Sequence, residues 1–120
     1  MINVPVSVGE LLDKISILQI KSKRICDPDK LANVRRELDA LTQAANGVRM
    51  PDHESQLYGV NCLLWDIEDR IREKEKLGKF DAEFVGLARA VYITNDKRAE
   101  IKRQINVVAG SELVEEKSYV

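Results

Sequence analysis

A charged side chain falls in the middle of an apolar helical stripe in VYITNDKRAEIKRQIN, residues 91–106. At about 100° per residue, Val91, Ile101 and Ile105 share one face of a helix, and Arg98 projects from the same face. An unpaired guanidinium in a helical core is strongly unfavourable, so Arg98 requires a carboxylate or a route to water. This segment therefore predicts a polar contact at the centre of the fold.

The acid for this contact is expected in a second helix, which contains LWDIEDRIREKE, residues 64–75. Glu68 lies closest to the apolar face of that helix, so we expect a Glu68–Arg98 ion pair between the two helices. Buried polar networks are stable only when every group in them is satisfied. The amides expected to supply the remaining donors and acceptors are Asn61, Asn95 and Gln19.

Two interpretations of this cluster remain open. In the first, it is a structural network that fixes the register of the helices, as a single polar position does in a coiled coil. In the second, it is an anion-binding pocket, in which Arg98 and either Arg72 or Lys102 grip a carboxylate or a phosphate.

Four helices, and no strand of consequence, are predicted around the cluster. Apolar residues recur every three or four positions in segments 8–26, 28–45, 54–77 and 82–108. Ile17 and Ile20 lie off the main apolar face of the first segment, which indicates that this helix is contacted on two sides. Capping residues and glycines mark the ends of the segments: Ser7 with Glu10, Asp27 with Pro28, Gly47, Gly78, Asp81 and Gly110.

The short connections favour an all-α fold, a four-helix bundle-like arrangement of two antiparallel hairpins. The third and fourth helices are the longest, at roughly 35–40 Å each. Their hairpin should overhang the body and expose apolar surface, which favours a homo-oligomer, in the simplest case a dimer. Residues 1–110 are expected to form a single helical domain, and residues 111–120 a short C-terminal tail.

Composition narrows the classes of function. Nineteen Lys and Arg against 20 Asp and Glu give a net charge of −1, which argues against nucleic-acid binding. The N-terminus has no signal-peptide pattern and no run approaches about 18 apolar residues, so we expect no membrane contact and a cytoplasmic location. Cys26, Cys62 and His53 are too few for a zinc site, and no phosphate loop or nucleophile motif is present. We expect no metal, no cofactor and no catalytic residue.

Several longer stretches resemble an uncharacterised family of small, mostly bacterial proteins. The stretches that carry this resemblance are VPVSVGELLDKISILQIKSKRI, LWDIEDRIREKE, FVGLARAVYITNDKRAEIKRQIN and GSELVEEKSY. The family has no established activity, so the resemblance implies a helical fold but no chemistry. Because EEKSY belongs to the pattern, it implies that Lys117 and Tyr119 dock on the body.

A looser resemblance is to the small all-helical chorismate mutases. In those enzymes arginine and lysine clamp a dicarboxylate beside a glutamate, and Glu10, Lys14, Glu68 and Arg98 would imitate that arrangement. The present chain has two hairpins, however, and its motifs do not align with theirs. The resemblance therefore serves only as an analogy for what such a pocket would hold.

The sequence thus favours a non-enzymatic interaction or scaffold domain, dimeric, with a protein partner. The alternative is a small-anion binding protein or a mutase-like enzyme built around Arg98 and Glu68. The residues predicted to bind such a ligand are Arg98, Glu68, Asn95, Asn61, Arg72, Lys102 and Lys14.

Overall fold

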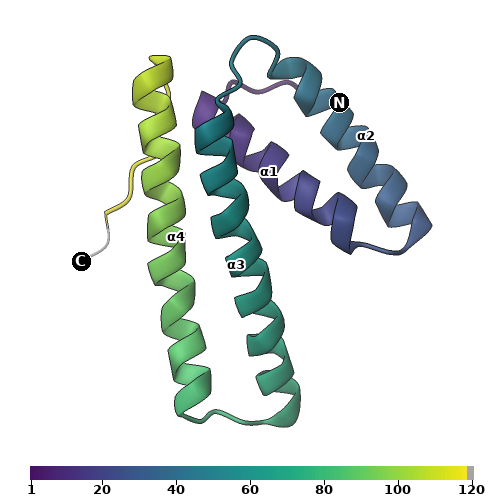
Figure 1. The fold of residues 1–120 in the computed structure, drawn as a ribbon, viewed down its shortest axis with the longest axis vertical. Helices are drawn as coiled ribbons and strands as arrows, with labels where there is room; N and C mark the ends of the chain where they lie inside the picture. Colours follow the sequence, from purple (N-terminus) through teal and green to yellow (C-terminus); the bar gives the residue numbers. More distant parts are fainter. Residues whose placement is uncertain (119–120) are drawn as a thin grey trace.

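The computed structural model describes residues 1–118, and over that range its regular secondary structure consists of helices alone (Figure 1). Its four helices confirm the predicted all-α class, and none of them is long and apolar enough to cross a bilayer. Their bounds are α1 (Val8–Arg24), α2 (Pro28–Ala44), α3 (Pro51–Leu77) and α4 (Ala82–Ala109).

α3 and α4 form a long antiparallel hairpin, and α1 lies between this hairpin and α2 (Figure 1). α1 packs against each of the other helices, whereas the lower halves of α3 and α4 extend past α1 and pack only against each other. The radius of gyration is 16.1 Å, compared with about 14 Å for a compact domain of this length. The predicted overhang of the hairpin is therefore present.

Local capping chemistry sets most helix ends where the sequence predicted them. The side chains of Ser7, Asp27 and Asp81 each accept a hydrogen bond from a backbone N–H in the first turn of α1, α2 and α4. Gly78 and Gly110 end α3 and α4 with φ of 63° and 67°, in the left-handed region that glycine adopts without strain.

Two boundaries differ from the predictions by more than one residue. α1 ends at Arg24 instead of residue 26, because the chain is already extended at Ile25, and Pro28 disfavours a helical Asp27. α3 begins at Pro51 instead of residue 54, so the segment around His53 is helical and not a loop. Proline suits the first position of a helix, and the Glu54 carboxylate accepts a hydrogen bond from the backbone N–H of Met50 at 2.8 Å.

The core lies where α1 crosses the upper part of the hairpin. Leu12 and Ile15 of α1 pack with Leu57 of α3 and Ile105 of α4, all almost completely buried. Ile20 is buried as well, which confirms that α1 is contacted on two sides. Val108, at the end of the apolar pattern predicted for residues 82–108, is exposed, because the last turn of α4 extends past α1 and α3 (Figure 1).

Candidate functional site

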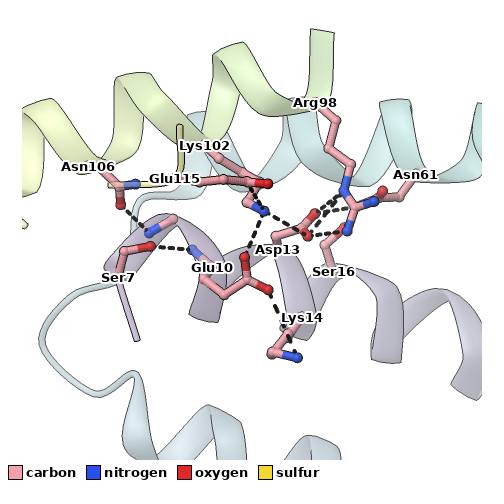
Figure 2. Close-up of polar contacts among 11 residues, drawn as sticks. Ser7, Glu10, Asp13, Lys14, Ser16, Asn61, Arg98, Lys102, Asn106 and Glu115 are labelled. Carbon is pink, nitrogen blue, oxygen red and sulfur yellow. Dashed lines mark hydrogen bonds and ion pairs between the residues drawn. The ribbon is translucent and has the colours of Figure 1, made fainter. Parts of the chain in front are cut away.

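Arg98 on α4 pairs with Asp13 on α1 and not with an acid of the hairpin. Its Nε lies 3.0 Å from Oδ1 of Asp13 and 3.1 Å from Oδ2, and Nη2 lies 2.5 Å from Oδ2 (Figure 2). The Asp13 side chain is 0% exposed and that of Arg98 is 27% exposed. The guanidinium therefore turns inward as predicted, and it meets a fully buried carboxylate.

The predicted Glu68–Arg98 pair is wrong. Glu68 lies on the exposed side of α3, where its carboxylate is 3.7 Å from Nε of Arg72, one helical turn along. The physical reason is that α1 crosses the hairpin and lies closer to Arg98 than the exposed face of α3 does. Asp13 belongs to a second buried face of α1, which it shares with Gly9, Ser16 and Ile20.

Asn61 completes the coordination of Asp13. Its side-chain Nδ2 donates to Oδ1 of Asp13 at 2.9 Å and lies 3.2 Å from Oγ of Ser16 (Figure 2). Asn61 thus belongs to the network as predicted, whereas Gln19 lines a separate hollow beside Tyr58. Three helices contribute to one buried carboxylate, which fixes how α1 sits on the hairpin.

Lys102, one turn beyond Arg98, extends the network toward the chain's tail. Its Nζ lies 2.7 Å from Oε2 of Glu10, 3.0 Å from Oε2 of Glu115 and 4.0 Å from Oδ2 of Asp13 (Figure 2). Burial lowers the pKa of Lys102, but the hydrogen bonds to the two glutamates raise it, and the net shift is upward. Lys102 is therefore held charged among three carboxylates.

The same contacts shift the pKa values of Arg98 and Glu115. The hydrogen bond to Asp13 raises the pKa of Arg98 above its ordinary value. The hydrogen bond from Lys102 lowers the pKa of Glu115. Lys14, also predicted as a ligand contact, lies 3.9 Å from Glu10 on the outer side of α1, with its side chain 51% exposed.

Gly9 allows α1 to approach α4 closely, and the sequence analysis did not identify it. Its backbone N–H donates to Oδ1 of Asn106 at 2.7 Å. A Cβ at this position would lie 2.6 Å from the backbone oxygen of Lys102 and 2.9 Å from Oδ1 of Asn106. Any larger residue would push α1 away from α4 and lengthen the contacts around Asp13.

The described part of the tail docks along α4 beside this network. The Ser111 hydroxyl accepts from the backbone N–H of Val8 at 3.2 Å, and Glu115 bonds to Lys102. Nη1 of Arg103 lies 3.4 Å from the Glu116 carboxylate. The docking expected of Lys117 stays a prediction, and that of Tyr119 lies outside the described residues.

Two hollows open beside Arg98. The larger, of about 430 Å³, lies between α1 and the hairpin over an apolar floor that includes Ile20 and Trp65. The smaller, of about 220 Å³, lies between α4 and the tail and is almost wholly polar, with Lys102 in its wall. The predicted ligand-binding residues that the larger hollow brings together are Arg98, Glu68, Asn95, Asn61 and Arg72.

The polar groups around Arg98 are satisfied by one another. Within residues 1–118, no three Asp, Glu, Cys or His side chains gather in a way that would hold a metal ion. Cys26 is an exposed free thiol and Cys62 is a half-buried one. The charged groups nearest Arg98 already bond to one another, and no buried side-chain polar atom in the described part of the chain lacks a hydrogen bond.

Comparison with known proteins identifies the family. The model of a family of unknown function, DUF6165, matches residues 2–120, which is nearly the whole chain, so the chain belongs to that family. No curated protein and no solved structure matches the chain.

Proposed function

We propose that this chain, as a member of a family of unknown function, is a non-enzymatic helical interaction domain. In this proposal residues 1–110 form one folded unit and the tail begins at residue 111. The observation that carries the proposal is the Asp13–Arg98 pair. The Nε–Nη2 edge of the Arg98 guanidinium is bonded to the buried carboxylate of Asp13. In this proposal Arg98 therefore holds α4 against α1 and has a structural role.

The exposed apolar side chains of the overhanging hairpin support an interaction role. Leu63 and Leu77 of α3 and Val85, Tyr92 and Ile93 of α4 are all exposed, and Phe80 is exposed in the turn between them. A contiguous patch of exposed apolar side chains often marks the place where a partner binds, and the proposal takes the hairpin to carry such a patch. A cytoplasmic location is part of the proposal, and the exposed free thiol of Cys26 is consistent with a reducing compartment.

Site-specific photo-crosslinking tests this function. A photoreactive amino acid replaces Tyr92 or Leu63 on the hairpin, and a control replaces Glu37, which is exposed on α2. Both hairpin positions should give the same discrete protein adduct in the cells that make the protein, identified by mass spectrometry. Adducts no stronger than that of the Glu37 control would contradict the proposal.

A second candidate function is the binding of a small anion in the larger hollow. The observation in its favour is that Nη1 of Arg98 makes no hydrogen bond within residues 1–118, while the other edge of the guanidinium is held by Asp13. A volume of about 430 Å³ is within the range of small-molecule sites. Glu68 and Asp69 on the rim oppose an anion, which ranks this function second.

Thermal-shift measurements with dicarboxylates, sugar phosphates and nucleotides test the second candidate. A ligand of the hollow should raise the melting temperature by mass action and change Trp65 fluorescence. The shift should disappear in Asn95→Leu, which replaces a polar side chain lining the hollow with an apolar one, and persist in Gln104→Leu on the exposed side of α4. Equal shifts in both variants would place the ligand elsewhere.

A further inference from the structure

A second hollow region of the hairpin lies on the face that α1 does not cover. It is largely apolar, measures about 770 Å³ and runs between α3 and α4. Val60 and Ile101 form part of its floor, and Leu63 stands on its wall with 48% of its surface exposed. No part of residues 1–118 outside the two helices lines it.

Helical periodicity places this open face opposite α1. On α3, Asn61 points toward Asp13 of α1, whereas Gly59 and Leu63 are rotated by roughly 160–200° from Asn61. On α4, Lys97 and Glu100 are likewise rotated away from Lys102, which reaches Glu10 of α1. The open face is defined here by Gly59, Val60, Leu63, Lys97, Glu100 and Ile101.

Gly59 has no explanation within the described part of the chain. Glycine in the middle of a helix is unfavourable relative to alanine because it loses more conformational freedom on folding. Gly9 is required, since a Cβ there would meet α4, but a Cβ on Gly59 would meet nothing within 4 Å. Gly86 is equally open, but only Gly59 lines the hollow, so its missing side chain leaves the backbone of α3 accessible there.

The spacing of Gly59 and Leu63 makes the open face complementary to itself. Leu63 is an apolar projection and Gly59 leaves a depression, and they lie one helical turn apart on the same side of α3. Consider two copies related by a two-fold axis that passes midway between the levels of Gly59 and Leu63. Leu63 of each copy then enters the depression over Gly59 of the other. Such reciprocal contacts define an isologous interface.

The charges beside the hollow have the same self-complementary pattern. Asp96, Lys97 and Glu100 of α4 line the hollow, and the exposed Lys97 and Glu100 lie within one turn and carry opposite charges. In the proposed dimer the same two-fold axis brings Lys97 of one copy beside Glu100 of the other, and the reverse. A partner of uniform charge would be repelled by one of the two residues.

From these observations, and resting on the proposed interaction function, we propose that the open face binds a second copy of this chain in an isologous dimer centred on Gly59 and Leu63.

Sedimentation velocity over a range of protein concentrations tests the proposal. The unchanged chain should sediment as a dimer, and Gly59→Leu should weaken dimerisation at least tenfold, because it fills the depression but meets nothing within its own chain. Gly86→Leu is the matched control, since a Cβ there also meets open space and the position lies outside the hollow. Circular dichroism should show both variants as helical as the unchanged chain.

A charge exchange identifies the partner as a second copy in this orientation. Lys97→Glu alone and Glu100→Lys alone should each weaken self-association, since each places like charges across the axis. An equimolar mixture of the two variants restores both opposite-charge pairs, so it should form a heterodimer with near-original affinity.

The proposed dimer would be overturned if the unchanged chain were monomeric, or if Gly59→Leu did not weaken the dimer. It would also be overturned if Gly86→Leu dissociated equally, or if the mixture of Lys97→Glu and Glu100→Lys stayed monomeric. These results differ from failure of the interaction function, which would appear as the absence of crosslinks from both Leu63 and Tyr92. If the chain is a monomer but both positions crosslink to one different protein, the interaction function is supported and the dimer is contradicted.

Discussion

Asp13 and Arg98, separated by 85 positions in the chain, form the ion pair that joins α1 to α4. The carboxylate has no exposed surface, while the guanidinium reaches the edge of the hairpin and lines both neighbouring hollows. Asn61 of α3 bonds to the same carboxylate, so a single buried acid is contacted by both arms of the hairpin.

Removing one member of this pair should be much more harmful than removing both. We expect Arg98→Met to lower the free energy of unfolding by about 3 kcal/mol, at the low end for a buried pair because the guanidinium reaches solvent. Asp13→Leu alone should have a similar effect, whereas the double variant should lose clearly less than the sum of the two. Urea unfolding followed by far-UV circular dichroism measures all four proteins. Additive losses would show that the two side chains do not interact.

A comparison of isosteric amides separates the observed partner of Arg98 from the partner that the sequence analysis predicted. Asp13→Asn should cost about 3 kcal/mol, because it removes the negative charge opposite a partly buried cation. Glu68→Gln should change the free energy of unfolding by less than about 0.5 kcal/mol, since Glu68 forms only an exposed pair with Arg72. Denaturation midpoints at neutral pH decide whether Asp13 or Glu68 is the partner of Arg98. A larger effect of Glu68→Gln than of Asp13→Asn would favour the Glu68–Arg98 pair.

Much of the fold could be predicted because its signals are local. The caps at Ser7, Asp27 and Asp81 each satisfy backbone groups within three residues, so short motifs contain all the information needed. The inward direction of Arg98 could be predicted in the same way from its position in the apolar stripe of α4.

The partner of Arg98 could not be predicted because it depends on how α1 crosses the hairpin. In ELLDKIS, Asp13 looks like a solvent-facing residue of an amphipathic helix, since Leu12 and Ile15 define the main buried face. Ile20 was the available signal: it marks a second buried face, and Asp13 lies seven positions before it on that face. Following that face back to Gly9 would have identified both the acid and the point of close approach.

The close approach at Gly9 should be sensitive to a single methyl group. Gly9→Ala places a Cβ against the backbone of α4, and backbone cannot move aside as a flexible side chain can. We expect a loss of about 1–3 kcal/mol, as for overpacking in a core. Gly86→Ala is the control, because its Cβ meets open space, and it should stabilise the protein by about 0.5–1 kcal/mol. Thermal unfolding of both variants checks the prediction, which fails if Gly9→Ala is neutral or stabilising.

Docking of the tail should depend on pH through Glu115 and Lys102. The pKa of Glu115 is lowered in the folded protein from its ordinary 4.5, so its contribution is complete above that value and is lost as the pH falls through the folded pKa. The pKa of Lys102 is raised from 10.5, so its contribution is complete below 10.5 and is lost as the pH rises through the higher folded value.

Glu115→Gln should therefore destabilise the protein between about pH 5 and 10 by no more than about 1 kcal/mol, because the Glu115 side chain is half exposed. The difference from the unchanged chain should shrink at both extremes of pH, as measured by urea unfolding at each pH, with Glu112→Gln, an exposed glutamate of the same tail, as the control. A difference that stays constant from pH 3 to pH 11 would mean that Glu115 acts through packing and not through its charge.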